Sequence, residues 1–215
     1  MYKRNVEGSE GKAKLNINLP QGVYIITATN PVNGEMAANN ITVLATIQNN
    51  TDLVKYYKNE SQYVVTVLGD DGKPVGAGVE VKFNINGVIY TRQTNESGQA
   101  KLNINLPQGN YVITAEYNGC KVSNNITVLP VLRANDLVIK QGTSDQFIAH
   151  LVDGQGKAYP NQEVSFNIHG VTYQRITDAD GRAILNIKLT AAADTYIITS
   201  SYNGCNIVNT IKIEP

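Results

Sequence analysis

Tryptophan, phenylalanine and histidine side chains are scarce in this chain. It has no tryptophan, three phenylalanines and two histidines in 215 residues. Exposed aromatic rings stack on sugars, so their scarcity counts against a carbohydrate-binding surface. His150 falls on the outward phase of a strand and His169 in a turn, so they are not a ligand pair. Without a Cys/His cluster, a Gly-rich phosphate loop or a convergent catalytic set, the sequence predicts no metal, no cofactor and no enzyme.

An excess of charge and a long apolar run are also missing. Lys and Arg number 18, as do Asp and Glu, so nucleic acid and anionic membrane surfaces are not expected partners. There is no run of 18 apolar residues and hence no predicted membrane span. The first residues, MYKRNVEGSEG, lack the apolar stretch of a signal peptide.

One long segment occurs three times. It reads AKLNINLPQGVYIITATN from Ala13, AKLNINLPQGNYVITAEYNG from Ala100 and AILNIKLTAAADTYIITSSYNG from Ala183, a period of about 85 residues. Such a period, with turn sequences inside it every 8 to 12 residues, is typical of tandem all-β domains. Copies in series usually supply length or valency, whereas catalysis needs a unique constellation.

The period divides the chain into three modules. Residues 1–45 match the second half of a module, strands D to G, while 46–130 and 131–215 are complete modules. Their connections, LATIQNNTDL and LPVLRANDL, are not flexible Gly/Ser linkers, so a stiff rod is expected. Because the chain begins inside a module, we expect it to be a slice of a longer protein whose signal and anchor lie elsewhere.

Strict alternation of apolar residues predicts the fold of each module. In the second module, Val81, Phe83 and Ile85 share one face, and Asn86-Gly87 supplies a two-residue hairpin turn. The first strand is expected to start at Asp52. Repeated over about seven strands, this pattern predicts an all-β fold: tandem Ig-like β-sandwiches, each with two antiparallel sheets, arranged as a rod.

The GKPV and TNESGQA turns, the L-P-x-G-x-Y-x-I-T block and the NNITV strand resemble a known family. They are similar to the bacterial Ig-like modules of invasin and intimin type, and more closely to the repeats of adhesin-like surface proteins of methanogenic archaea. This resemblance covers nearly the whole chain and implies a fold more than an activity. It implies secreted, cell-wall-anchored stalks, some of which end in ligand-binding tips.

Three tyrosines occupy equivalent positions, Tyr24, Tyr111 and Tyr196. The LPQG-Y block around the first two resembles a tyrosine corner, in which the hydroxyl bonds to the backbone of the turn before strand F. Tyr196 follows TAAAD in place of the Pro-Gln-Gly turn, so a looser corner is expected there.

The two cysteines, Cys120 and Cys205, are equivalent residues of separate modules. A rod would hold them far beyond the ~7 Å Cα separation that a disulfide allows. Since the first module has Glu35 there, the fold does not require a thiol. We expect free, buried, inert thiols, with intermolecular pairing or metal binding as the alternatives.

Asn39, Asn124 and Asn209 recur in the last strand of each module, in phase with the inward residues. A buried amide must be satisfied, either by a bulge that turns it outward or by a bond to a neighbouring loop. A Lys–Asn isopeptide cross-link is a third interpretation, for which Lys55, Lys58 and Lys140 are the candidate amines.

Asp residues at the module joints, Asp52 and Asp136, or in the turn at Asp70 and Asp71, offer too few oxygens for a calcium site, which needs six to eight. Turn and strand-start roles are expected for them.

Together these observations predict an extracellular, cell-surface stalk or spacer whose ligand is unknown. The alternatives are a carbohydrate- or protein-binding module and a filament subunit. The last alternative rests on residues 1–45, because a half module leaves an apolar sheet open and could self-associate.

Overall fold

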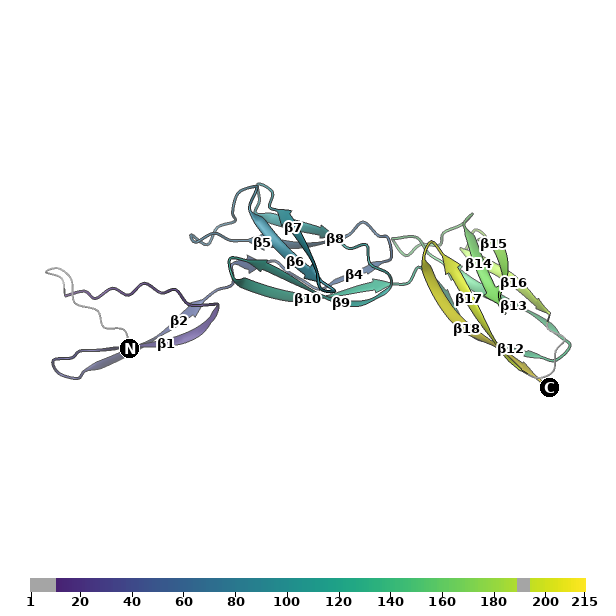
Figure 1. Cartoon of the computed structure of the whole chain (residues 1–215), viewed down its shortest axis with the longest axis horizontal. Helices are drawn as coiled ribbons and strands as arrows, with labels where there is room; N and C mark the ends of the chain where they lie inside the picture. The colour runs from purple at the N-terminus through teal and green to yellow at the C-terminus, as the bar shows by residue number, and fades with distance from the viewer. Residues whose placement is uncertain (1–10, 189–193) are drawn as a thin grey trace.

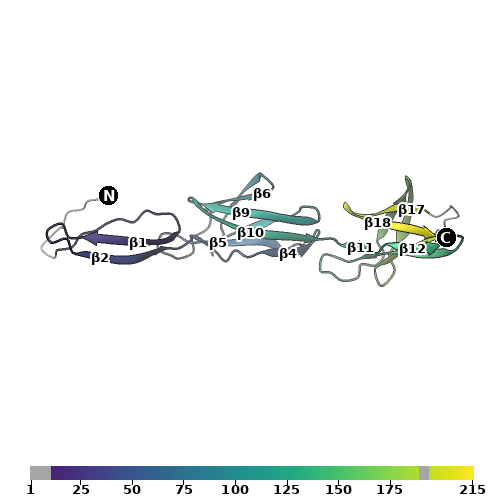
Figure 2. The same ribbon diagram turned by 90° about the horizontal axis from the view of Figure 1, so that it is seen from below.

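The computed structural model describes residues 11–188 and 194–215, which form strands and turns. Three units lie in a line, with the β1–β2 hairpin at one end and β18 in the unit at the other (Figure 1). The line persists when the molecule is turned by 90° (Figure 2). Within the described residues, no helix has the length and apolar character needed to cross a membrane.

The strands fall into three modules. The first holds β1 (Gly22–Thr29) and β2 (Met36–Val43). The second holds β3 (Ile47–Gln48), β4 (Leu53–Tyr56), β5 (Gln62–Val67), β6 (Glu80–Ile85), β7 (Val88–Gln93), β8 (Gln99–Asn103), β9 (Gly109–Tyr117) and β10 (Cys120–Leu129). The third holds β11 (Leu132–Ala134), β12 (Leu137–Lys140), β13 (Ser144–Leu151), β14 (Glu163–Ile168), β15 (Val171–Ile176), β16 (Arg182–Lys188), β17 (Thr195–Tyr202) and β18 (Cys205–Glu214).

Each complete module is a sandwich of a five-stranded and a three-stranded sheet. The orders β4-β10-β9-β6-β7 and β3-β5-β8 in the second module recur as β12-β18-β17-β14-β15 and β11-β13-β16 in the third. This topology is immunoglobulin-like, so the predicted fold class is confirmed.

The first strand of each complete module is divided between the two sheets. β3 pairs antiparallel with β5, whereas β4 pairs parallel with β10. The expected single strand from Asp52 is therefore wrong. The chain changes sheet where Asn49 has a φ of 54°, a conformation that ends a regular strand.

Alternation and turn chemistry explain the remaining strands. Along β6 the side chains of Val81, Phe83 and Ile85 are buried while those between them are exposed. Asn86 and Gly87 both have positive φ, 54° and 75°, as a two-residue hairpin of type I′ requires. The same geometry recurs at Asn118-Gly119 and Asn203-Gly204, and at His169-Gly170, where the structure has a His in place of Asn.

Equivalent aromatic pairs lie in the cores of the two complete modules. The rings of Tyr63 and Phe83 meet edge to face with centroids 5.9 Å apart, and those of Phe147 and Phe166 do so at 5.8 Å. All four side chains are at most 1% exposed. Each sandwich thus has its own core, contributed by both of its sheets.

The first module is less regular than the sequence predicted. Of its expected strands D to G, the counterpart of D lies on residues 1–10, outside the described residues. Strand E was expected at 13–19, but no strand forms there. In the second module the matching strand, β8, pairs only with β5. No counterpart of β5 exists among the described residues of the first module, so this segment lacks its hydrogen-bonding partner.

Candidate functional site: the joints between modules

The turn before strand F is held by a tyrosine in two modules. Tyr24 donates its hydroxyl hydrogen to the Pro20 carbonyl at 2.8 Å, and Tyr111 does the same to Pro107 at 2.8 Å. These are the bonds expected of a tyrosine corner. The ring of Tyr196 packs on that of His169, with centroids 5.0 Å apart. Most of the turn before Tyr196 lies outside the described residues.

Each of the two held turns places a glutamine against the next module. Gln108 accepts a hydrogen bond from the Cys205 thiol, with Sγ 3.0 Å from Oε1, and donates from Nε2 to the Asn206 carbonyl at 2.9 Å. Gln21 makes the same two contacts with Cys120 and the Lys121 carbonyl, each at 3.4 Å. We call this repeated contact the Gln–Cys joint. It connects the end of one module to the first residues of strand G in the next.

The joint between the second and third modules has further contacts. The side chains of Tyr56 and Tyr57 pack against the core of the third module. A Cβ on Gly204 would lie only 3.3 Å from the Tyr57 hydroxyl. Tyr57 packs closely here because Gly204 has no side chain. Asn59 also donates its side-chain amide to the Gly154 carbonyl. Glycines of the third module therefore leave room for the larger side chains of the second.

The thiols are free, but they differ in burial. Cys205 is 3% exposed, whereas Cys120 is only half-buried, against the expectation of a buried thiol. The reason lies in the modules before them. The second module contributes Tyr56 and Tyr57 to the joint around Cys205. Among the described residues, the first module has no first strand and so gives Cys120 no counterpart of these two tyrosines.

This difference predicts unequal reactivity toward a thiol reagent. In the native protein, Cys120 should react at least about tenfold faster than Cys205, because Cys205 reacts only when its joint opens. Gln108→Ala should raise the rate at Cys205 and leave Cys120 unchanged. Peptide mass mapping of the labelled protein measures both sites. Equal rates, or an increase at both sites in the variant, would show that the joint does not protect the thiol.

The asparagine of strand G fastens the divided first strand in each complete module. Asn124 accepts hydrogen bonds from the Tyr63 hydroxyl at 2.7 Å and from the Asn50 amide at 2.8 Å, and donates to Asp52 at 3.2 Å. Asn209 donates to the Ala134 carbonyl and to Asp136. The β9–β10 register runs without a bulge, so the loop-bonding alternative describes this residue. Asn39, whose module lacks a described first strand, is exposed.

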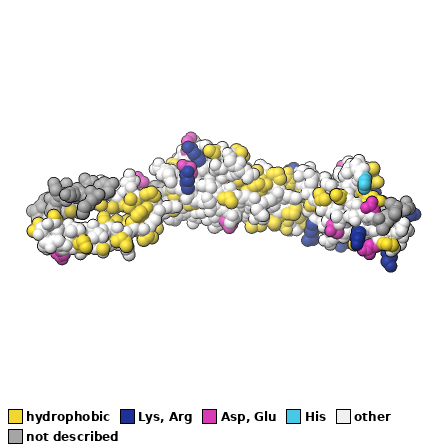
Figure 3. Space-filling model, turned by 60° about the horizontal axis from the view of Figure 1, so that its bottom comes forward, with side chains coloured by type: hydrophobic (Ala, Val, Ile, Leu, Met, Phe, Trp, Pro, Cys, Tyr) yellow, Lys and Arg dark blue, Asp and Glu magenta, His cyan; other side chains and the backbone are white. Residues whose placement is uncertain are grey.

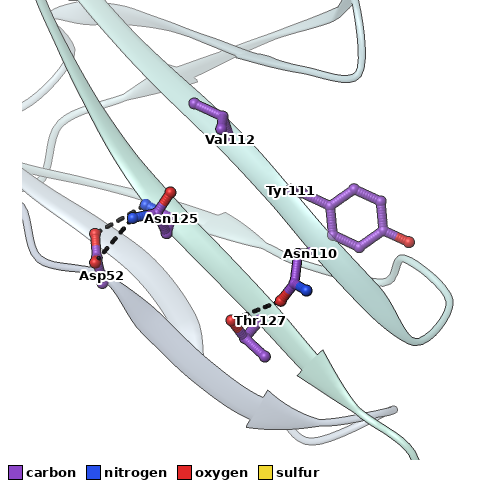
Figure 4. A pocket seen from close by; sticks show the side chains of 6 residues that line it. All are labelled: Asp52, Asn110, Tyr111, Val112, Asn125 and Thr127. Atoms are coloured by element: carbon purple, nitrogen blue, oxygen red, sulfur yellow. Dashed lines mark hydrogen bonds between the residues drawn. The ribbon is translucent and has the colours of Figure 1, made fainter.

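The carboxylate of Asp52 completes this fastening. Hydrogen bonds from the Asn125 backbone N–H, the Asn125 side chain and the Asn124 side chain lower the pKa of Asp52. Figure 4 shows Asp52 facing Asn125, and Asn110 facing Thr127, around a hollow of about 410 Å³. These polar groups are paired with one another, which favours a structural role for the hollow. Asp136 is held likewise by the Thr210 N–H and Asn209, which lower its pKa.

The amine of Lys55 does not meet Asn124. It is 4% exposed and donates to the carbonyls of Ser61 and Ile104 at 3.0 and 2.9 Å. Burial lowers the pKa of Lys55. In the third module the equivalent residue is Ile139, since both pair at the same step of strand G. The other two candidate amines, Lys58 and Lys140, are exposed, and Lys140 lies opposite Glu214 in the β12–β18 ladder. The contacts of Lys55 therefore give the isopeptide interpretation no support, and the other two candidates are not the buried amines that it needs.

Sequence reasoning missed the role of the glutamines. A relevant pattern was present, because the two LPQG turns are each followed by a module with Cys after Asn-Gly. The first module has Glu35 at that position. What the pattern could not show is that these residues, about 98 positions apart, meet in space.

Comparisons with known proteins find solved structures that resemble this chain weakly. No family model matches the sequence, and no curated protein matches it. A titin I9–I11 tandem is 13% identical over 89% of this chain and 73% of its own, with a TM-score of 0.41. Invasin, a bacterial integrin-binding protein, is 20% identical over 81% of this chain and 40% of its own, at 0.34. The Escherichia coli adhesin FdeC is 14% identical over 90% of this chain and 74% of its own, at 0.33. These values are low, so the strand pairings above establish the fold.

Proposed function

We propose that the chain is a stalk segment of an extracellular, adhesin-like surface protein, which holds another region of that protein away from the cell. One observation carries this proposal: the Gln–Cys joint occurs at both junctions, with the same two kinds of hydrogen bond. Consecutive modules thus meet through direct contacts. A repeated fixed junction is what a spacer of defined length requires.

The family resemblance supports the same role. Invasin/intimin-type modules and archaeal surface repeats form such stalks, and adhesins occur among the structural likenesses above. In the proposed role, the apolar residues and the tyrosine corners keep each module folded, and the joints keep the modules aligned. Binding would then reside outside this chain.

Two measurements on the 215-residue chain test the proposal. Small-angle scattering should give an elongated particle, because the modules are joined end to end. A radius of gyration near the globular value of about 17 Å would contradict it. An array of glycans and surface proteins should show no reproducible ligand. Specific binding there would instead favour a module whose exposed faces are the contact surface.

A further inference from the structure

The last strand of each five-stranded sheet has an open edge. β7 ends the order β4-β10-β9-β6-β7 and β15 ends the equivalent order, so each pairs with one neighbour among the described strands. Both are six residues long, whereas β4 and β12, at the opposite edges, have four. The edge strands β8 and β16 of the smaller sheets carry exposed lysines, Lys101 and Lys188. An open edge is a template on which another chain can pair, so β7 and β15 need protection of their own.

The hairpin turn decides which backbone groups of β7 face the open edge. Asn86-Gly87 joins β6 to β7, so Ile85 and Val88 close the turn as a hydrogen-bonded pair. Along an antiparallel ladder, such pairs alternate with pairs that are not hydrogen-bonded. Ile89 and Thr91 belong to the second kind. Their N–H and carbonyl groups therefore point away from β6, toward the open edge.

An arginine covers an outward carbonyl in both complete modules. Arg92 donates from Nη1 to the Thr91 carbonyl at 2.8 Å, and Arg175 donates from Nη1 to the Gln174 carbonyl at 2.7 Å. β15 follows the His169-Gly170 turn in the same register as β7, so Gln174 corresponds to Thr91. Each guanidinium thus occupies the place where an incoming strand would put a backbone N–H.

The side chain of Arg92 starts from the inner face of the sandwich. Arg92 lies opposite Val81 and Tyr90 lies opposite Phe83, and the side chains of Val81 and Phe83 are fully buried. The guanidinium lies over the Tyr90 ring, with Cζ 5.8 Å from its centroid. A strand added to β7 would withdraw this charge from water at a cost in free energy. Inward-pointing charges on edge strands are one way in which β proteins prevent edge-to-edge pairing.

Only the residues in phase with these arginines recur between the two strands. β7 reads VIYTRQ and β15 reads VTYQRI, so Val, Tyr and Arg are kept while the residues between them differ. The net charge of the chain is zero, so long-range repulsion does not keep its copies apart. On the face drawn in Figure 3, Lys and Arg side chains are scattered over the complete modules and form no single basic patch. Protection against pairing must therefore be local to each edge.

We propose that Arg92 and Arg175 are edge guards, which keep β7 and β15 from pairing with the same strands of a second copy of this chain. A second copy is the partner because the edge is complementary to itself. In an antiparallel pair of β7 strands, the outward N–H and carbonyl of Thr91 can exchange both hydrogen bonds with Thr91 of the second copy. The inference goes beyond the stalk role, since it concerns how identical chains stay separate side by side.

The test removes both guards from the 215-residue chain. Arg92→Thr combined with Arg175→Thr leaves good strand-forming residues at the two positions. The control is Lys82→Thr combined with Lys212→Thr, which removes the same two charges from exposed positions of the inner strands β6 and β18. In sedimentation equilibrium, the unguarded variant should self-associate at concentrations at least about tenfold lower than the wild type. The control should behave as the wild type.

Hydrogen exchange locates the contact in the associated variant. The outward amides of Ile89 and Thr91 should exchange at least about tenfold more slowly there than in the wild type at the same concentration. An unguarded variant that associates no more than the wild type overturns the proposal. So does equal association of the control, which would assign the effect to net charge. Association that leaves the amides of Ile89 and Thr91 unprotected would place the contact elsewhere and overturn it too.

A rescue experiment separates edge pairing from aggregation of an unfolded variant. Thr91→Pro and Gln174→Pro, added to the unguarded variant, remove an outward N–H from each edge without removing a hydrogen bond to β6 or β14. The chain should then be as monomeric as the wild type. Proline would not rescue an unfolded chain, so association that persists with the prolines would refute the edge guards.

Discussion

Replacing Ile104 by Ala is expected to lower the free energy of unfolding of the second module by about 2–5 kcal/mol. Ile104 is 2% exposed, so truncation removes buried methyl groups and leaves a cavity between the sheets. The same substitution at Ile17 should cost about 1 kcal/mol or less, because that side chain is 41% exposed and little of its surface is withdrawn from water. Both residues lie in the same AKLNIN sequence, so the comparison isolates burial from local sequence.

Hydrogen exchange of core amides is the suitable measurement, because a chain of several modules does not unfold in one two-state transition. Exchange at Ala115 and Val128 reports on the second module, where both residues are buried. Lys101→Ala, on the exposed side of β8, serves as a control and should change stability by about 0.5 kcal/mol or less. If Ile17→Ala and Ile104→Ala were equally costly, the difference in burial between these two residues would not hold in solution.

Local patterns in the sequence were sufficient for the sandwich itself. Alternation placed Val81, Phe83 and Ile85 in the core, and Asn-Gly pairs placed the hairpins. Both depend on short-range geometry: side chains in a strand point alternately to opposite faces, and Asn-Gly adopts positive φ at low cost. The three-fold repetition then supplied the number of modules. These features recur in each copy, so each copy supports the prediction made from the others.

Features that depend on contacts between distant segments were not predicted. The first strand changes sheets at Asn49 because Asp52 and Asn50 are held by Asn124, and nothing near Asn49 in the sequence shows that pairing. The missing strand at 13–19 is the converse case. Its residues match those of β8 and its following residues, yet it forms no strand, and the described residues hold no counterpart of β5 to pair with it. Strand formation is thus a property of the pair, which sequence alternation alone does not reveal.

The buried amine of Lys55 shows a third kind of failure. Its position near the first strand made Lys55 one of three candidate cross-linking amines, but the packing places it between two carbonyl acceptors. In the third module the same position is occupied by the buried side chain of Ile139, which needs no hydrogen-bond acceptor. A lysine in phase with inward residues can be accommodated when backbone carbonyls face it, and the location of those carbonyls is set by tertiary structure.

Gly156→Ala is expected to open the joint between the second and third modules. Gly156 has a φ of +79°, and a Cβ there would lie 2.7 Å from the Tyr56 ring, so the ring must shift from its position against the third module. Gly72 occupies the same turn position in the second module, with a φ of +74° and no atom within 4 Å of its would-be Cβ. Both substitutions cost about 1 kcal/mol in backbone conformation. Only the first also displaces an inter-module contact.

Residual dipolar couplings distinguish the two variants. In the wild type and in Gly72→Ala, the second and third modules should align with a common tensor, as a rigid pair does. In Gly156→Ala the two tensors should differ, and the Cys205 thiol should become more reactive, because loss of the Tyr56 contact loosens the cover over that residue. If Gly156→Ala left the common alignment intact, the tyrosine contact would be dispensable. The alignment of the stalk would then depend on the Gln108–Cys205 hydrogen bonds and the short connection alone.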